Sequence, residues 1–325
     1  MLSVVVPIFN EAQSLEALHR ELREVALANG YELDLLLVDD GSTDDSWEVI
    51  CRLAAADQQL HGIRFRRNFG KAAALSAGIA EARGELVMTL DADLQDDPHE
   101  IPRFLAMMEK HFDVVSGWKK VRHDPWDKVL PSRLFNRTVS GVTGVTLHDH
   151  NCGMKCFRRQ IFDEIRIYGE LHRFIPVLAA ARGYRVGEVV VNHRPRRFGR
   201  SKYGVGRLVK GFLDLLTVKF LTAFGERPQH VLGSAGLASL GLGLLGLAHL
   251  LLAWIVTRVV PSATWLMPYG SLATIGSIGL LFLGGQLLSL GLLGELLVAQ
   301  RGPVIPRYSI LERTGAMSSP QAVTP

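Results

Sequence analysis

Two long segments without charge near the C-terminal end constrain the fold of this chain more than any other sequence feature. Residues 232–256 contain no Lys, Arg, Asp or Glu, and residues 270–299 contain only Glu295. An α-helix rises about 1.5 Å per residue, so segments of this length can cross a hydrocarbon core of about 30 Å. Two transmembrane helices joined by residues 257–269 are therefore expected. A buried helical hairpin in a soluble protein is the less favoured alternative.

The charged residues are concentrated in the first 231 residues. Only four of the 36 Lys and Arg residues, and two of the 32 Asp and Glu residues, lie beyond that point. Residues 193–231 carry nine basic and two acidic residues, whereas the link at 257–269 has one basic residue. Membrane helices are flanked by basic residues on the cytoplasmic side. This distribution places the soluble region and both termini in the cytoplasm.

The overall composition excludes several classes of protein. The net charge is only +4 at pH 7, with both signs mixed through the charged region, so no nucleic-acid partner is expected. An odd number of cysteines, Cys51, Cys152 and Cys156, does not form a disulfide framework and fits a reducing compartment. The apolar run Leu2–Ile8 has only the length of a strand, so no cleaved signal peptide is expected.

Short β-rich segments alternate with helical patterns over residues 1–192. This alternation predicts an α/β domain with a mostly parallel sheet, covered by helices on both faces. Ligands of such sheets bind beyond the carboxyl ends of the strands. The predicted strands are Leu2–Ile8, Leu33–Val38, Ile63–Phe65, Leu86–Leu90 and Asp113–Ser116, and the predicted helices are Ala12–Ala28, Asp45–Ala56, Lys71–Ala82 and His99–Lys110.

Residues 205–224 have the pattern of an amphipathic helix. Their apolar residues recur at helical spacing, and Arg207, Lys210 and Lys219 take other positions. The pattern indicates a helix at the membrane surface, where basic side chains meet anionic headgroups. A helix packed on the sheet is the alternative.

Polar residues follow three of the predicted strands, at 9–11, 39–44 and 91–97. Each group alone could form a turn or a helix cap. Together they place several carboxylates at one edge of the sheet, where a cation or an oriented ligand would offset their repulsion.

Asp91, Asp93 and Gln95 alternate along an extended segment, so their side chains can point the same way. Such oxygen ligands suit Mg²⁺ or Mn²⁺, which bind carboxylates together with substrate phosphates. A diphosphate-bearing substrate is implied. The sequence has no P-loop and no Gly-x-Gly-x-x-Gly after the first strand, so an ATPase and a dinucleotide dehydrogenase are unsupported.

Four motifs now carry a family resemblance: VVVPIFNE at 4–11, VDDGSTD at 38–44, RNFGK at 67–71 and DADLQ at 91–95. They resemble the family 2 (GT-A) glycosyltransferases, and more narrowly the polyprenyl-phosphate branch, which includes dolichyl-phosphate mannose synthases and bacterial undecaprenyl-phosphate glycosyltransferases. The resemblance covers residues 1 to about 225, and the two-helix tail is similar to that of the bacterial members. It implies a GT-A catalytic domain at 1–192, a basic interface segment at 193–231, a transmembrane hairpin at 232–300 and a cytoplasmic tail at 301–325.

The resemblance also implies roles for individual residues. Asp91, Asp93 and Gln95 would hold Mg²⁺ or Mn²⁺ on the diphosphate, and Asp93 would be catalytic. Family members more often have Tyr at the position of Phe9, so a hydroxyl contact is absent here while ring stacking is expected to survive. The residues implied to bind the nucleotide are Pro7, Phe9, Asn10, Glu11, Asp39, Asp40, Lys71 and Asp91.

The acceptor side follows from charge and from the same resemblance. Arginine binds phosphate through a planar set of donors, and Arg122 and Arg133 resemble the acceptor-phosphate arginines of the branch by position. Arg197, Ser201 and Lys202, in the segment before the first apolar helix, are implied to contact the diphosphate or the lipid phosphate. Solvated surface charge is the alternative for each arginine.

Asp149 matches an aspartate that lies at the reaction centre in the family. An acceptor phosphate with a second pKa near 6 is already a nucleophile, so Asp149 is expected to orient the acceptor or to support developing charge; a turn residue is the alternative. Neighbouring His148, His150, Cys152 and Cys156 do not have the spacing of a zinc site, and ordinary packing is expected for them.

The predicted activity is an inverting transfer of a hexose from a nucleotide sugar to undecaprenyl phosphate at the inner face of a bacterial cytoplasmic membrane. UDP-glucose is the first donor considered, with GDP-mannose as an alternative. A processive polysaccharide synthase is less favoured, because the chain has no Gln-x-x-Arg-Trp motif and too few membrane helices, and a non-catalytic scaffold would not need Asp91 and Asp93. Small residues at Ala235, Ser239 and Gly243 predict a homo-oligomer or, alternatively, close packing within the hairpin.

Overall fold

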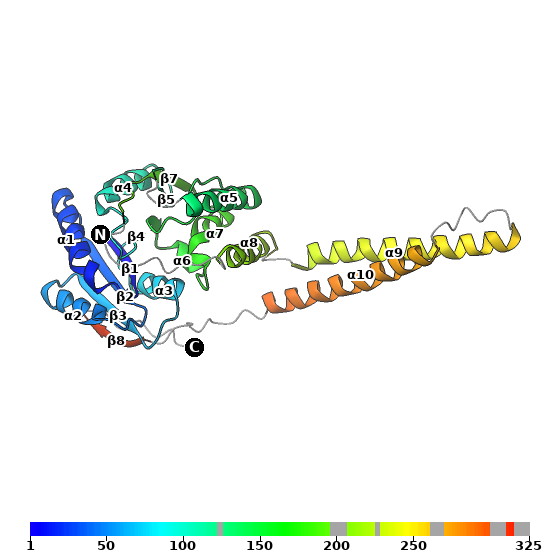
Figure 1. The fold of residues 1–325 in the computed structure, drawn as a ribbon, viewed down its shortest axis with the longest axis horizontal. Coiled ribbons are helices and arrows are strands. Elements are labelled where there is room, and N and C mark those ends of the chain that lie inside the picture. Colours follow the sequence, from blue (N-terminus) through cyan, green and yellow to red (C-terminus); the bar gives the residue numbers. More distant parts are fainter. Residues whose placement is uncertain (122–125, 196–206, 225–227, 261–269, 300–309, 315–325) are drawn as a thin grey trace. The chain divides into compact units, whose positions relative to one another are not determined.

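A computed structural model of the chain (Figure 1) describes residues 1–121, 126–195, 207–224, 228–260, 270–299 and 310–314. The chain divides into two compact units. The first comprises Met1–Lys219 together with Ile305–Pro325, and the second comprises Phe220–Val304.

One sheet forms the centre of the first unit, with the strand order β7-β5-β6-β4-β1-β2-β3-β8. Strand β6 runs antiparallel to β4 and β5, and β8 runs antiparallel to β3, whereas all other neighbours are parallel. The strands are β1 (Leu2–Ile8), β2 (Leu33–Asp39), β3 (Leu60–Phe65), β4 (Leu86–Thr89), β5 (Val114–Trp118), β6 (Lys155–Arg158), β7 (Val186–Val190) and β8 (Ile310–Thr314).

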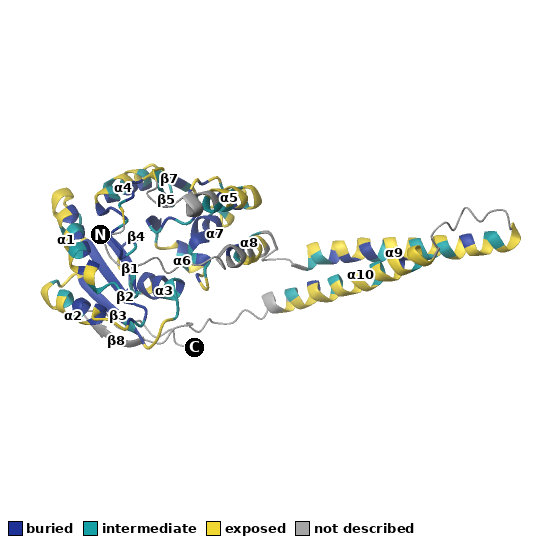
Figure 2. Ribbon diagram, viewed as in Figure 1, coloured by how far each residue is buried: buried dark blue, intermediate teal, exposed yellow. Residues whose placement is uncertain are grey.

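Helices cover both faces of this sheet (Figure 1). The central strand β1 is largely buried (Figure 2), and its Val4, Val5 and Val6 are fully buried, because each face of the strand is covered. The helices of this unit are α1 (Ala12–Asn29), α2 (Ser46–Ala56), α3 (Lys71–Glu81), η1 (Pro98–Glu100), α4 (Ile101–Glu109), α5 (Trp126–Thr143), α6 (Ile161–Glu164), η2 (Leu171–Phe174), α7 (Ile175–Ala181) and the main part of α8 (Arg207–Phe224).

The α/β fold with a mostly parallel sheet is confirmed, and each strand and helix predicted within residues 1–116 is present with ends that differ by at most three residues. Strands β6, β7 and β8 were not predicted. The segment 301–325, predicted as a cytoplasmic tail, supplies β8, which pairs with β3 from Gly62 to Phe65. A short edge strand that follows a long apolar helix has no sequence pattern to distinguish it from a tail.

Helix α8 has one side against α5 and one side exposed. Leu215 and Val218 are buried, whereas Leu213 and Leu216 are more than half exposed. The ammonium of Lys219 donates to the Val142 carbonyl of α5 at 2.9 Å. The helix therefore packs on a neighbouring helix and still presents leucines on its outer side.

The second unit contains α9 (Pro228–Val259) and α10 (Gly270–Ala299), which pack along each other. Both are long and apolar enough to cross a membrane, and most of their apolar side chains are exposed. The Ser239 hydroxyl donates to the Leu280 carbonyl at 2.8 Å, and Gly243 lies against Leu281. Two of the three small residues thus serve packing within the hairpin, while Ala235 is exposed and the predicted oligomer stays a prediction.

Candidate functional site

The carboxyl ends of β1, β2 and β4 meet at one edge, because these strands are parallel neighbours. The Asn10 amide donates to Ser42 Oγ at 2.9 Å, and the Thr43 amide donates to Asn10 Oδ1 at 2.8 Å. The side chain of Asn10 therefore ties the first strand end to the second. The predicted nucleotide-binding residues of the first end are all half-buried: Pro7, Phe9, Asn10 and Glu11.

Asp40 connects the second strand end to the loop after β3. Its carboxylate accepts hydrogen bonds from the amides of Phe69 at 2.7 Å and Gly70 at 2.9 Å. A Cβ at Gly41 would lie 2.5 Å from the Arg67 carbonyl carbon, so only glycine allows this close approach of two loops. Burial raises the pKa of Asp40, and the two amide hydrogen bonds act in the opposite direction.

Asp39 is fully buried beneath the same loop. It accepts from the Ser42 amide at 2.8 Å, and Arg64 Nε lies 3.5 Å from its second carboxylate oxygen. Burial raises the pKa of Asp39 as well. The carboxylates of Asp39 and Asp40 thus hold loops in place, and their predicted contacts with base and ribose stay predictions.

Asp91 forms the polar centre of the site at the end of β4. Its carboxylate is ion-paired with Lys71, the first residue of α3, and its side chain is about one-third exposed. Burial would raise the pKa of Asp91, but the charges of Lys71 and Lys119 outweigh it and bring the pKa to about 2. Asp91 is therefore ionised at neutral pH and available as an anionic ligand.

The loop after Asp91 is held by its own backbone and by Lys119. The Gln95 amide donates to Asp93 Oδ1 at 3.1 Å, and the Asp91 amide donates to Asp96 Oδ2 at 3.3 Å. Lys119 Nζ lies 2.9 Å from the other carboxylate oxygen of Asp96. The sequence motif did not indicate the roles of Lys119 and Asp96, because it marks only the alternating positions.

A second set of contacts ties this loop to the chain after β7. The Arg194 amide donates to the Gln95 carbonyl at 3.0 Å, and its guanidinium contacts Asp97 at 2.5 Å and Glu21 at 2.6 Å. Arg194, which precedes the predicted acceptor residues Arg197, Ser201 and Lys202 in the sequence, is thus bound to the loop that contains Asp93.

The residues predicted to hold a metal fit a hard divalent cation by their donor atoms. Asp91, Asp93 and Gln95 offer carboxylate and amide oxygens, and Asp91 is held in its charged form. Glu21, Asp97 and His99 also lie within reach of one another, but the Arg194 guanidinium already contacts both carboxylates of this group. That second group is consequently a poor cation site.

The loop 148–153 closes the site from the side of β6. A Cβ at Gly153 would lie 2.5 Å from Asp91 Oδ2, so the backbone of this loop packs directly on the Asp91 carboxylate. Asp149 is buried, and its Oδ1 accepts from the Asn151 amide at 3.1 Å. This is the turn contact considered as the alternative for Asp149, whose role in transfer stays a prediction.

The remaining predicted residues fall into two groups. Arg133 is described and lies exposed on α5. Arg122, Arg197, Ser201 and Lys202 lie outside the described residues.

The histidines and cysteines near Asp149 are engaged in packing and hydrogen bonds. His148 pairs with Glu188, and the buried His150 ring lies 3.1 Å from Ser140 Oγ. Cys152 and Cys156 are buried free thiols.

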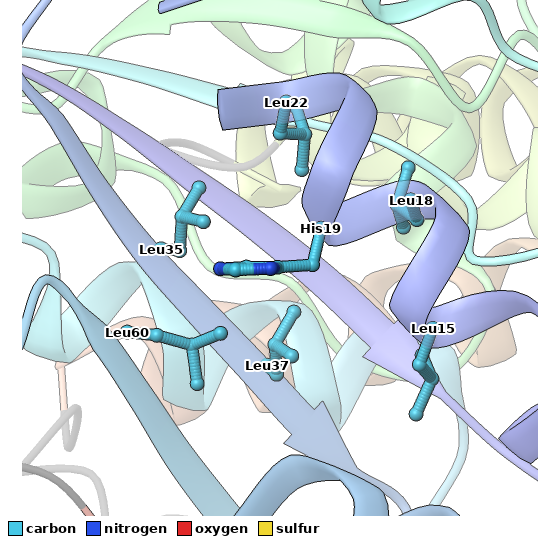
Figure 3. Close-up of a pocket in the computed structure, with 7 residues that line it drawn as sticks. All are labelled: Leu15, Leu18, His19, Leu22, Leu35, Leu37 and Leu60. Carbon is cyan, nitrogen blue, oxygen red and sulfur yellow. The ribbon is translucent and has the colours of Figure 1, made fainter. Parts of the chain in front are cut away.

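An apolar hollow lies between α1 and strands β2 and β3 (Figure 3). It is lined by apolar side chains and the His19 ring, which pairs with Asp57 at 2.7 Å. Such a lining belongs to the packing of α1 on the sheet and does not suit a charged nucleotide sugar. The leucines are Leu15, Leu18, Leu22, Leu35, Leu37 and Leu60.

The mostly parallel sheet, with its acidic strand ends on one edge, has the GT-A fold. The fold is similar to the crystal structure of glucosyl-3-phosphoglycerate synthase from Mycobacterium tuberculosis in complex with Mn²⁺ and UDP-glucose. The TM-score is 0.53 at 19% identity, over 67% of this chain and 78% of that chain. At this identity the similarity shows the fold alone.

The chain belongs to glycosyl transferase family 2, whose model matches residues 3–166. It is 41% identical to the dodecaprenyl-phosphate galacturonate synthase of Rhizobium johnstonii over 73% of this chain and 71% of the relative. It is 36% identical to the undecaprenyl-phosphate 4-deoxy-4-formamido-L-arabinose transferase of Pseudomonas syringae over 98% of this chain and 92% of the relative. The expected membership in the polyprenyl-phosphate branch and the expectation of a glycosyltransferase enzyme are both confirmed.

Proposed function

We propose that the protein transfers a sugar from a nucleotide sugar to undecaprenyl phosphate at the cytoplasmic face of a bacterial inner membrane. The observation that carries the proposal is the ionised Asp91 carboxylate, held between Lys71 and the loop 148–153 at the edge where parallel sheets bind ligands. The names of both relatives contain a polyprenyl phosphate, which supports a lipid acceptor.

The strand β8 supports the proposed topology. It follows α10 and pairs with β3, which supports a hairpin whose two ends are on the same side of the membrane. Two membrane spans return the chain to the side of the membrane from which it entered. The basic residues before α9 support the cytoplasm as that side.

In the proposed reaction, an acceptor phosphate oxygen attacks the anomeric carbon and the nucleoside diphosphate leaves with inversion. Asp91, Asp93 and Gln95 would hold Mg²⁺ or Mn²⁺, which when bound stabilises charge on the diphosphate. Lys71 keeps Asp91 ionised, and its ammonium adds positive charge at the same edge. Asp149 orients the acceptor, which needs no strong base because its phosphate is already anionic.

The donor sugar is the finer part of the proposal. UDP-glucose is the donor that the sequence suggests, whereas the relatives are named for galacturonate and 4-deoxy-4-formamido-L-arabinose. A donor panel therefore includes UDP-glucose, the UDP forms of the other two sugars, and GDP-mannose.

The test is transfer of radiolabelled sugar from each donor to undecaprenyl phosphate by the detergent-purified protein, with and without Mn²⁺. Asp93→Ala should abolish transfer, and Asp163→Ala, which changes an exposed aspartate of α6, is the matched control. Metal-dependent labelling of the lipid by one donor, lost only in Asp93→Ala, would support the proposal and name the sugar. Nucleotide binding without lipid labelling by any donor would refute the proposed acceptor.

A further inference from the structure

Glu188 lies in the middle of β7 and accepts three hydrogen bonds from the start of the loop 148–153. The amides of His148 and Asp149 donate to Oε1 at 2.9 and 3.1 Å, and His148 Nδ1 lies 2.7 Å from Oε2. The side chain of Glu188 is 13% exposed. One carboxylate thus fixes two consecutive amides and the ring beside them.

The neighbours of Glu188 hold the same point of the loop. The His148 ring stacks on Trp118 with centroids 3.9 Å apart and planes at 13°. Asn136 Nδ2 of α5 donates to the His148 carbonyl at 2.9 Å, and Ser116 Oγ lies 3.4 Å from the Asp149 carbonyl. The position of Asp149 is therefore set from β5, β7 and α5 together.

The far end of the loop touches the acidic site. Thr89 Oγ1 donates to the Gly153 carbonyl at 2.7 Å, and the ammonium of the buried Lys155 bonds the Cys152 carbonyl. Gly153 in turn packs on the carboxylate of Asp91. The loop therefore contacts Glu188 at its start and Asp91, a predicted metal ligand, at its end.

We infer that Glu188 is a positioning residue for sugar transfer: by holding the His148 and Asp149 amides, it sets the place of Asp149 and of the loop backbone against Asp91. This inference rests on the proposed function, since it assumes that transfer takes place beside Asp91. The length of the side chain is the decisive property, because its Oε1 must reach two amides from a fixed strand. Sequence patterns did not mark Glu188, which is a single acidic residue in an edge strand.

The experiment compares three substitutions of Glu188 in the full-length detergent-purified protein, with undecaprenyl phosphate and the active donor. Glu188→Gln keeps the length and an oxygen acceptor, Glu188→Asp keeps the charge but is one methylene shorter, and Glu188→Ala removes both. Asp57→Ala is the matched control, because the Asp57 carboxylate also accepts from a histidine and from a backbone amide, but at α1 and α2. Thermal unfolding is measured for each variant.

A positioning role predicts that kcat is highest in Glu188→Gln, lower in Glu188→Asp and lowest in Glu188→Ala. Glu188→Gln should stay within about threefold of the wild type, whereas Glu188→Ala should lose about 100-fold in kcat, as a misplacement of about 1 Å can cause. The KM for the donor should change less than about twofold, because most of the residues predicted to bind the nucleotide follow β1 and β2, which are several strands away from β7 in the sheet. If Glu188→Ala fails to fold, the comparison of Gln with Asp decides.

Several results would overturn the inference. A Glu188→Asp variant more active than Glu188→Gln would mean that charge matters and length does not. Unchanged kcat in a folded Glu188→Ala, or a loss that Asp57→Ala reproduces at equal loss of thermal stability, would show a structural role only. Full activity of Asp149→Asn, with an active wild type, would refute the inference and leave the proposed function intact. An inactive wild type would refute both.

Discussion

Replacing Gly153 by alanine tests whether the loop 148–153 shapes the acidic site. The added Cβ would lie 2.5 Å from Asp91 Oδ2 and 2.9 Å from Oδ1, whereas ordinary contacts begin at 3.4 Å. The carboxylate must therefore move by about 0.9 Å, a displacement that can cost about 100-fold in rate, or about 2.7 kcal/mol of transition-state stabilisation. We expect kcat/KM for sugar transfer to fall by this amount.

The same substitution should have little effect on folding. The atoms that must move are the end of a side chain that is 32% exposed, so the carboxylate can rotate away without disturbing the core. The free energy of unfolding should change by less than about 1 kcal/mol. Gly141→Ala in α5 is the matched control, because a Cβ there meets open space; it should keep full activity and stabilise the helix by about 0.5 to 1 kcal/mol.

The assay is steady-state transfer to undecaprenyl phosphate by both alanine variants, with unfolding followed in the same detergent. Full activity of Gly153→Ala would refute the reasoning, since the site would then tolerate a displaced Asp91 carboxylate. A large loss of stability without a specific loss of kcat/KM would also refute it.

Three further predictions concern stability. Asp40→Ala leaves two loop amides without their acceptor and should lower the free energy of unfolding, measured by chemical denaturation, by about 2 to 4 kcal/mol. Asp40→Asn keeps an acceptor, so its free energy of unfolding should fall by less than half of that amount. Burial, and then the charge of Lys155, lower the pKa of His150 to about 4. Below pH 6.5 the unfolded chain binds a proton at this histidine and the folded chain does not, so the free energy of unfolding should fall by up to about 3 kcal/mol between pH 6.5 and 4. The fall should be smaller in His150→Gln. In α10, Gly284→Val would meet the Gly236 carbonyl at 2.8 Å and should weaken the pairing with α9 in thermal unfolding, while Gly285→Val meets open space and should not; equal midpoints would contradict the packing.

The predicted site residues that the structure brings to one edge are those that share a local pattern. Asn10, Asp40 and Asp91 each come directly after a β-rich run, and parallel strands bring their carboxyl ends to one edge. Strand and helix patterns have periods of two and 3.6 residues, so a short window of sequence is enough to detect them. The two apolar helices can also be predicted locally, because their length and lack of charge are visible in the sequence without knowledge of what they pack against.

Long-range pairings were beyond prediction for a physical reason. Glu188 meets His148 at a separation of 40 residues, and Arg194 meets Glu21 at a separation of 173 residues. Side chains at such separations come together only when the sheet has formed, and many acidic and basic residues of this chain could have been paired on charge alone. The edge strand β8 is a similar case, since its partner β3 lies near the other end of the chain.

The sequence by itself determined the α/β class, the acidic strand ends and the two apolar helices, because burial of apolar surface imposes short periods on the residues that form them. Only the tertiary structure decided that Asp40 and Asp39 hold loops, that Lys71 keeps Asp91 ionised, and that a loop anchored by Glu188 packs against that carboxylate. These properties depend on distances of a few ångströms between segments that are remote in the chain, and the packing of the folded domain sets such distances.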